Sequence, residues 1–493
     1  MSSRTILVFC AMLTLARANL IHVPGDSATI QKGLNGAASG DTVLVAAGGY
    51  KERIVWPNRD GILLLSEAGA EATEISGTDS GRVITMNAQD YTSSTMVSGF
   101  TISHGLVTAS PGDGAGVWCR GAPVFCNDRI VHNLNFTMGY GGGVYAVGAP
   151  VFHHNLIAWD TVWNPGGGGW RYGGGIYCQG PGVFYQNVFL ENAAYDTNPG
   201  GFWYGGGLYL QGAGIVFNNL FVRNRIGATT GGIAYGGALY LGAESALVAN
   251  NTFVANMCST AIPSGAAIFS SYPRVTVKNN IITDNVATGL APSGGGITCY
   301  PDSLDTLVCD YNDVWHNTPQ DFRGCRPGAG ALSLDPLFAV GPNGEYYLSQ
   351  VAAGQDSTSP CVDAGDTLLA TVSLNLDSLV HAWTTRTDSL PDSGLIDLGY
   401  HYLSYPLTAL HQQPVSLPSR AALLRASPNP FRNSVRLEVP SGAGADMVEI
   451  RDVTGRVVCR LPIRAGACRW DCRSPAGVYF VRSGSLKLKL VRE

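Results

Sequence analysis

The chain has 493 residues, of which 63 are glycine, 45% are hydrophobic and only 14% are charged. The formal net charge is -5, so no basic surface argues for nucleic-acid binding. Abundant glycine and few charges favour many tight corners around an apolar interior, and the length leaves room for one long domain and a small accessory domain.

The first residues have the features of an export signal. Arg4 supplies a positive charge, residues 6–15 form an apolar stretch too short to span a bilayer, and residues 16–18 read ARA, a small-residue cleavage site. We therefore expect a signal peptide over residues 1–18 and an exported chain. No other run is apolar and long enough to predict a transmembrane helix.

Residues 27–46 predict an amphipathic helix followed by a strand. Ile30, Leu34 and Ala37 share one helical face, and the strand runs over residues 42–46. Such a helix can cover the open end of a stacked β-structure, where unpaired strand edges would favour aggregation.

A short motif of small residues, one aliphatic residue and usually one aromatic residue then recurs seven times. The copies are GAGVW, GGGVY, GGGIY, GGGLY, GGALY, GAAIF and GGGIT, and they begin at Gly114, Gly141, Gly173, Gly205, Gly236, Gly265 and Gly294. The steps between them are 27, 32, 32, 31, 29 and 29 residues, which indicates one supersecondary unit per repeat. This region is therefore a solenoid.

Two columns of amide side chains keep the same register. The first comprises Asp128, Asn155, Asn187, Asn219, Asn251, Asn280 and Asn312. Five residues later in each repeat, the second comprises Asn133, Asp160, Asn192, Asn224, Asn256, Asn285 and Asn317. Stacked asparagines can hydrogen-bond from coil to coil, so we interpret both columns as structural.

Each repeat is predicted to contain three short strands separated by turns. Glycine and asparagine at the corners, with β-branched or aromatic residues between them, favour a parallel β-helix, and no helical spacing competes with it. Cys119, Cys178 and Cys299 share one repeat position and are expected to point inward. Cysteines 459, 468 and 472 are better candidates for disulfides, with no connectivity assigned, and the absence of a C-x-x-C pair argues against a zinc or redox centre.

Three groups of motifs carry a resemblance to known β-helix families. The string TIQKGLNGAASGDTVLVAAGGYKERI resembles the N-terminal cap of secreted pectin-lyase-like right-handed β-helix proteins. The segments DPLF, GEYYL, SPCVDAGD and IDLG, which begin at residues 335, 344, 359 and 396, are similar to the closing coils of bacterial surface β-helix proteins. FLEN, FVRN and FVAN, together with the glycine motif, resemble the repeats of polymorphic outer-membrane proteins, a family linked to adhesion. The resemblance implies a β-helix over residues 19–402, with closing coils over 331–402.

The pattern changes after residue 402. Residues 403–424 have no periodicity and are predicted to be a linker. Residues 425–493 contain SPNPF, DVTGR, a GVY strand and a basic final strand, KLKLVRE, and resemble the immunoglobulin-like C-terminal sorting domain of type IX secretion substrates. This resemblance implies export by an outer-membrane secretion machinery, followed by release or attachment at the surface of a Gram-negative-type bacterium.

The aromatic residues of the repeats are the first candidate for a functional surface. Strand alternation points one residue per repeat outward and predicts an external aromatic ladder of Trp118, Tyr145, Tyr177, Tyr209, Tyr240 and Phe269. The glycine-rich loops add Trp163, Trp170, Tyr172, Trp203 and Tyr204 on one side of the solenoid. These rings predict recognition of a glycan or a protein. The alternative is that the loops fold over the ladder and the rings pack together.

Catalytic candidates are few. Hydrolysis needs a carboxylate pair, and lyase chemistry needs a basic residue with acidic calcium ligands. The best candidates are Asp160, Glu191, Asp196 and Arg171. Asp160 occupies an asparagine-column position, and Glu191 lies one coil from Arg223, so a surface salt bridge accounts for it.

We therefore expect an all-β chain, a right-handed parallel β-helix followed by a small β-sandwich. The predicted role is adhesion or carbohydrate binding, with a polysaccharide, a cell-surface glycan or a protein as partner. A polysaccharide lyase or glycoside hydrolase is the first alternative, and a structural envelope protein is the second. No metal or cofactor is expected, and calcium stays an open alternative that no acidic cluster indicates.

Overall fold

The computed structural model describes most of the chain. The described residues are 18–404, apart from 110–111, 138, 164–168, 197–199, 229–230, 243–244, 273, 301–306 and 368–375, and 425–492, apart from 428–432, 440–446, 453–455, 465, 472–473, 476 and 484–485. The predicted signal peptide and linker lie almost entirely outside these residues.

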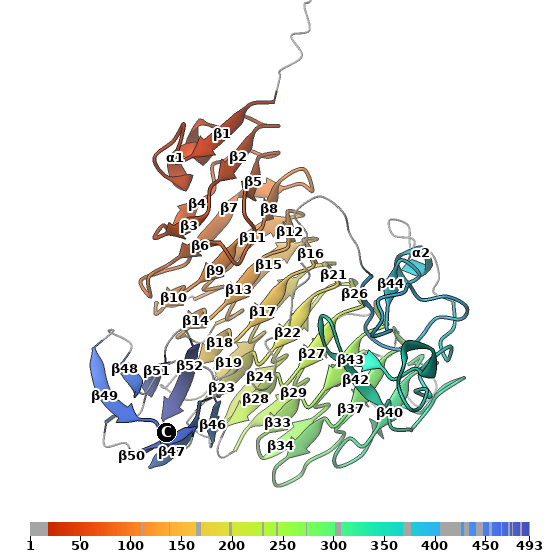
Figure 1. The fold of residues 1–493 in the computed structure, drawn as a ribbon. Coiled ribbons are helices and arrows are strands. Elements are labelled where there is room, and N and C mark those ends of the chain that lie inside the picture. Colours follow the sequence, from red (N-terminus) through yellow and green to blue (C-terminus); the bar gives the residue numbers. More distant parts are fainter. Residues whose placement is uncertain are drawn as a thin grey trace, which may run out of the picture.

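Residues 20–323 form a parallel β-solenoid, which confirms the predicted fold class (Figure 1). Three parallel sheets, A, B and C, run along its length with ten strands each. Sheet A contains β1 (Leu20–Val23), β2 (Thr42–Val45), β5 (Leu63–Ser66), β8 (Met96–Ser98), β12 (Val124–Cys126), β16 (Val151–His153), β21 (Val183–Tyr185), β26 (Ile215–Phe217), β31 (Ala246–Ala249) and β36 (Val275–Lys278).

Sheets B and C complete the three walls. Sheet B contains β3 (Gly48–Tyr50), β6 (Thr73–Ser76), β9 (Thr101–Ser103), β13 (Arg129–Val131), β17 (Leu156–Ala158), β22 (Val188–Leu190), β27 (Leu220–Val222), β32 (Thr252–Val254), β37 (Ile281–Thr283) and β40 (Asp313–Trp315). Sheet C contains β4 (Ile54–Val55), β7 (Ile84–Tyr91), β11 (Val117–Gly121), β15 (Val144–Gly148), β20 (Ile176–Gln179), β25 (Leu208–Leu210), β30 (Leu239–Leu241), β35 (Ile268–Ser270), β39 (Ile297–Cys299) and β41 (Phe322–Arg323).

The central coils contain two more strands than the three predicted. Sheet D contains β10 (Leu106–Val107), β14 (Leu134–Asn135), β18 (Thr161–Trp163), β23 (Ala193–Asp196), β28 (Arg225–Ala228), β33 (Met257–Ser259) and β38 (Val286–Thr288). Sheet E contains β19 (Gly169–Tyr172), β24 (Gly201–Tyr204), β29 (Ile233–Tyr235) and β34 (Ile262–Ser264). The glycine-rich segments were expected to be loops, but their aromatic residues pair with the same segment of the next coil and so extend the solenoid.

The sequence motifs define the corners and the core. Gly173 has a φ of +65°, and a Cβ on the following Gly174 would lie 2.3 Å from the Gly206 carbonyl oxygen, so the close approach of neighbouring coils requires small residues there. The interior is one apolar cluster in which equivalent side chains stack, as in the pair Phe189 and Phe221, whose ring centroids are 4.5 Å apart. The three cysteines expected to point inward are all buried in this core.

Both asparagine columns are buried hydrogen-bonded ladders, as predicted. In the first, Asn187 Nδ2 donates to Asn219 Oδ1 over 2.9 Å, and Asn219 Nδ2 donates to Asn251 Oδ1 over 3.0 Å. Each amide also binds the backbone of its own and the preceding coil, because Asn219 Nδ2 reaches the carbonyl oxygens of Phe184 and Phe217. The ladders therefore satisfy the polar backbone at two corners of each coil.

A short helix covers the first coil at the N-terminal end (Figure 1). Helix α1 (Ile30–Gly36) begins at Thr29, whose hydroxyl accepts a hydrogen bond from the Lys32 backbone N–H over 3.2 Å. Ile30 and Leu34 are fully buried and join the solenoid core. In the part of the chain that the structure describes, no helix is long and apolar enough to cross a membrane.

The segment after the last coil returns along the side of the solenoid and packs beside the later coils (Figure 1). It contains a hairpin of β42 (Phe338–Gly341) and β43 (Gly344–Leu348), the 3-10 turn Val351–Ala353, helix α2 (Leu376–Val380), and the antiparallel pair β44 (Trp383–Thr384) and β45 (Tyr402–Leu403). We call residues 335–403 the closing segment.

The C-terminal residues form two antiparallel sheets that share one hydrophobic core. One sheet contains β46 (Arg425–Ser427), β47 (Ser434–Glu438) and β50 (Ala467–Asp471), and the other contains β48 (Met447–Asp452), β49 (Val457–Pro462), β51 (Gly477–Ser483) and β52 (Leu486–Arg492). This domain lies beside the strands of sheet D in Figure 1, drawn in blue.

Candidate functional site

Sheet C carries the predicted aromatic ladder. We call it the inner column, and its members pair in register from coil to coil: Trp118, Tyr145, Tyr177, Tyr209, Tyr240 and Phe269. The ring centroids of Tyr145 and Tyr177 are 5.4 Å apart, and those of Tyr209 and Tyr240 are 4.7 Å apart. The planes of both pairs are within 13° of parallel, so the rings stack face to face along the solenoid.

A second column of tyrosines packs against the first. We call it the outer column, and each member directly precedes a glycine-rich run: Tyr140, Tyr172, Tyr204 and Tyr235. Tyr172 meets the ring of Tyr209 edge-on at 5.0 Å, and Tyr204 meets Tyr240 in the same way at 4.9 Å. Together the two columns form a continuous aromatic seam where sheets C and E meet.

The packing decides which parts of these rings face solvent. Tyr177 and Tyr209 are 6% and 8% exposed, whereas Tyr145, Tyr240 and the whole outer column are half-buried. Most rings stack on their column neighbours, and Tyr235, which is tilted by 59° to Tyr204, stacks on Phe269 instead, so the seam presents ring edges and phenol hydroxyls rather than free faces. The predicted alternative, in which the rings pack together, therefore describes much of the seam correctly. Burial raises the pKa of Tyr145 and of Tyr172, so these phenols stay uncharged.

Amide and hydroxyl groups form a polar rim beside the inner column. The Tyr177 hydroxyl donates to Gln211 Oε1 over 2.6 Å, and the Tyr240 hydroxyl lies 2.5 Å from the Ser271 hydroxyl. Gln179 and Gln211 occupy one position of successive coils, and both side chains are exposed. The sequence analysis did not single out this rim, although Gln179, Gln211 and Ser271 each follow an inner-column aromatic residue by two positions.

The outer face of sheet E carries an apolar strip next to the outer column. We call it the sheet E strip, and its members pair in register: Trp170, Phe202, Ile233 and Ile262. Trp170 is 57% exposed and Ile262 is 45% exposed. Strand alternation places these side chains on the same face as the outer-column tyrosines two residues later. The accessible aromatic surface is therefore widest at sheet E.

Two of the predicted ligand-binding residues are not on this surface. Trp203 is 0% exposed and lies between sheets D and E, because alternation along β24 turns it inward. Trp163 is 2% exposed and packs on the outer face of sheet D, away from the seam. The prediction that both would line an aromatic loop face is wrong: sheet E packs on sheet D and buries Trp203, and Trp163 is buried in a separate cluster on the other face of sheet D.

Three of the four catalytic candidates are buried. Asp160 is a member of the second asparagine ladder, where its Oδ1 accepts from the Asn133 backbone N–H over 2.8 Å. Arg171 and Asp196 form an ion pair of 2.7 Å between sheets D and E, and neither side chain is exposed. A substrate cannot reach any of these groups, so all three have structural roles.

The fourth candidate behaves as the sequence predicted. Glu191 pairs with Arg223 over 2.8 Å, and both side chains are about one-third exposed, at 31% and 34%. Burial lowers the pKa of Arg223, but Glu191 and then Tyr346 and Glu345 raise it, so the pair lies beside the closing segment. Among the described residues, no group of three or more histidine, cysteine or acidic side chains could hold a metal ion.

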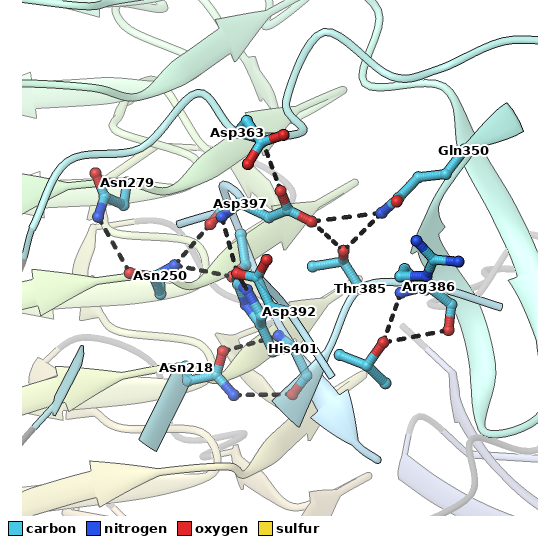
Figure 2. Close-up of polar contacts among 12 residues, drawn as sticks. Asn218, Asn250, Asn279, Gln350, Asp363, Thr385, Arg386, Asp392, Asp397 and His401 are labelled. Atoms are coloured by element: carbon cyan, nitrogen blue, oxygen red, sulfur yellow. Dashed lines mark hydrogen bonds and ion pairs between the residues drawn. The ribbon is translucent and has the colours of Figure 1, made fainter. Parts of the chain in front are cut away.

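A polar cluster in the closing segment has the composition of a catalytic site but not its accessibility (Figure 2). We call it the clasp; it comprises Gln350, Thr385, Asp392, Asp397 and His401. His401 Nε2 lies 3.1 Å from Asp392 Oδ2, and the same oxygen accepts from the Asp397 backbone N–H over 3.1 Å. His401 is 0% exposed and Asp397 is 2% exposed, so the clasp is part of the interior.

The clasp holds the closing segment on the solenoid. Asn218 exchanges two hydrogen bonds with the His401 backbone, at 2.8 and 2.9 Å, and Asn250 Nδ2 donates to the Asp397 carbonyl oxygen over 3.0 Å (Figure 2). Burial and then the charge of Asp392 raise the pKa of Asp397 to about 6. Burial acts to raise the pKa of Asp392. The hydrogen bond from His401 and the charge of that histidine outweigh burial, so the pKa of Asp392 is lowered. Sequence patterns did not predict this cluster because its partners are 147 and 183 residues apart along the chain.

A family model and a solved structure match parts of this chain. The family described as "Disaggregatase related" matches residues 185–365, which is less than half of the chain. No curated protein matches. The solved structure of a mutant of AlyGC, a PL6 family alginate lyase, matches with 15% sequence identity and a TM-score of 0.28. That match covers 72% of this chain and 59% of the lyase, so this chain spans less than two-thirds of the lyase's length.

Proposed function

We propose that this chain binds a polysaccharide at the cell surface through the aromatic seam and the adjoining sheet E strip. The observation that carries this proposal is the continuity of the seam: ten aromatic rings from two columns follow one another without interruption over the central coils. Their exposed edges, phenol hydroxyls and rim amides repeat at the coil spacing of about 4.8 Å. A ligand that is itself a linear repeat can use the same contact many times.

Binding without cleavage is favoured by the placement of the acidic residues. Asp160 and Asp196 are buried, and Glu191 is paired beside the closing segment. None of these carboxylates faces the seam, so a polysaccharide lying there meets no general acid or base among the sequence-predicted candidates. We therefore propose adhesion rather than lyase or hydrolase activity. The experiment below can detect either activity.

The route to the surface belongs to the same proposal. The N-terminal signal features and the C-terminal resemblance to type IX sorting domains support export through an outer-membrane secretion machinery. The two-sheet domain at the C-terminus is compatible with that assignment, because it has its own hydrophobic core and joins the solenoid after a separate segment.

The test compares polysaccharide retention by the wild-type chain, Trp170→Ala and a matched control. Leu390→Ala is the control, because Leu390 is 56% exposed, close to the 57% of Trp170, and lies in the closing segment away from the seam. In affinity electrophoresis against a polysaccharide panel, Trp170→Ala is expected to weaken binding by about 1 kcal/mol, roughly fivefold, as for a ring in a recognition surface.

The same samples are followed for unsaturated products and new reducing ends. Cleavage by the wild-type chain would make it an enzyme and contradict the proposal. Equal retention of Trp170→Ala and wild type, or no retention of any polysaccharide, would remove the seam and strip as the binding surface.

A further inference from the structure

We infer that the ligand of the aromatic seam is an uncharged polysaccharide rather than a polyanionic one. This inference rests on the proposed function and adds the chemical class of the ligand. Its evidence is the charge distribution of the coils that build the seam, which is separate from the evidence for the seam itself.

The seam is built from a stretch of chain with few charges. Residues 130–243 contain six charged side chains, Asp160, Arg171, Glu191, Asp196, Arg223 and Arg225. This range spans the inner column from Tyr145 to Tyr240 and all four outer-column tyrosines. A surface that recognises uronates or sulfates needs basic side chains on the ligand side, because an anion that loses its water without gaining a cation is penalised by several kcal/mol.

Two of the three basic residues in this stretch are held in ion pairs, and the third belongs to another sheet. Arg171 is 0% exposed and paired with Asp196 between sheets D and E. Arg223 is paired with Glu191 beside the closing segment. Arg225 belongs to β28 of sheet D, where its register partners are Ala193 and Met257 rather than any residue of the seam. No basic residue from this stretch therefore occupies a position in the two aromatic columns.

The groups that do line the seam are uncharged hydrogen-bonding groups. The phenols of Tyr145, Tyr204 and Tyr240 have pKa values raised by burial, so they remain protonated, and the rim offers the amides of Gln179 and Gln211. Phenol, amide and hydroxyl groups each offer both hydrogen-bond donors and acceptors, as sugar hydroxyls do. They match a neutral sugar without a cost in desolvated charge.

Charged residues mark the two ends of this neutral stretch. At the first end, the Arg82 guanidinium lies 5.9 Å from the Trp118 ring and donates to the Asp113 and Gly114 carbonyl oxygens. At the other end, Arg323 pairs in register with Thr298 after the last ring of the inner column. The charges of Asp113 and Arg120 also act on Tyr145, and the charge of Arg323 acts on Tyr235. The uncharged part of the inner column therefore runs from Tyr177 to Tyr240 and spans two coil steps, or roughly 10 Å, which is long enough for about two sugar units.

The experiment measures binding of the full chain to two matched panels at two salt concentrations. The neutral panel contains xylan, galactan and glucomannan, and the anionic panel contains alginate, polygalacturonate and chondroitin sulfate. We expect at least one neutral polysaccharide to bind at least tenfold more tightly than every anionic one. We also expect its Kd to change less than twofold between 50 and 500 mM NaCl, since no ion pair is screened.

The outcomes separate this inference from the proposed function. Preferential binding of an anionic polysaccharide, weakened by salt and by Trp170→Ala, would overturn the inference and leave the proposed function in place. Binding to neither panel would overturn both. Gln211→Ala removes one rim amide at an exposed position, and we expect it to weaken binding of the neutral ligand at least threefold with an unchanged Tm. Unchanged affinity would show that the rim does not recognise the ligand.

Discussion

At the scale of single residues, the corner asparagines do the most to define this fold. The side-chain oxygen of each asparagine accepts hydrogen bonds from the backbone N–H and the side-chain amide of the preceding coil. Its own NH2 group donates to the asparagine of the next coil, so one residue type satisfies polar groups on several coils. Aspartate at the same position can accept but, when ionised, cannot donate. Asp128 stands at the end of the first ladder, and burial raises its pKa well above the usual range. The protonated carboxyl, which can donate, is therefore favoured there.

Removing one rung is expected to be costly. Asn219→Ala deletes the donor to the Phe184 and Phe217 carbonyl oxygens and the acceptor for the Asn187 amide, all of them buried. Because each unsatisfied buried group costs about 1–3 kcal/mol, we expect a loss on the order of 3 kcal/mol in the free energy of unfolding, measured by urea denaturation. Asn35→Ala, on the exposed face of α1, is the control and should change stability little. Equal effects of the two substitutions would mean that the ladder does not stabilise the solenoid.

At the scale of elements, periodic features were predictable and contacts across the chain were not. The register of the glycine and asparagine motifs predicted the stacked coils, the buried Asn219 ladder and the aligned rings of the inner column. The sequence-based interpretation missed sheet E because its strands are short and glycine-rich, which is also typical of loops. It therefore placed Trp203 outside, although pairing of β24 with its neighbours turns this ring inward.

The closing segment shows the second limit of sequence reasoning. Its contact with the solenoid depends on pairs such as Asn218 with His401, which no local pattern links. The acidic candidates for catalysis were chosen by residue type, but charge type alone does not distinguish an exposed carboxylate from the buried pair of Asp196 with Arg171.

The clasp makes the stability of this element depend on pH. The folded chain holds the proton of Asp397 up to a pKa of about 6, whereas the unfolded chain releases it near the ordinary value of 3.8. The fold therefore binds this proton more tightly, so the contribution of Asp397 to stability falls as the pH rises from about 4 to about 6. Asp392, whose pKa is lowered, has the opposite effect, which is lost as the pH falls below its ordinary value.

We expect Asp397→Asn to flatten the dependence of Tm on pH between about 4 and 6, because the substituted side chain no longer titrates there. Its amide oxygen can still accept from the Asp363 backbone N–H, which the carboxylate does over 2.7 Å. Asp90→Asn is the control, since that carboxylate is 69% exposed. Parallel profiles for Asp397→Asn and wild type would show that this carboxyl does not titrate in the interval.

At the scale of the whole molecule, the C-terminal domain and the solenoid share an apolar contact. Phe480 of β51 packs against a cluster on the outer face of sheet D that contains Leu134, Trp163 and Tyr195. These strands lie side by side in Figure 1, at the end of β14 and β18. Trp163 is 2% exposed although it points away from the solenoid, so its burial depends on what covers this face of the sheet. The seam and the strip of sheet E are not part of this contact.

Phe480→Glu tests whether the domain covers this face. A carboxylate placed against the cluster is expected to separate the domain from sheet D, because an unpaired charge cannot remain in an apolar contact. Trp163 then becomes accessible, and we expect acrylamide to quench the tryptophan fluorescence more strongly than in the wild type. The increase should vanish in the Trp163→Phe background, which assigns it to this ring. Val457→Glu is the matched control, because Val457 belongs to the same domain and is already 36% exposed. Stronger quenching in this control, or no increase in quenching in Phe480→Glu, would contradict the prediction. Trp163 would then be buried by the solenoid alone, and no apolar contact would hold the two domains together.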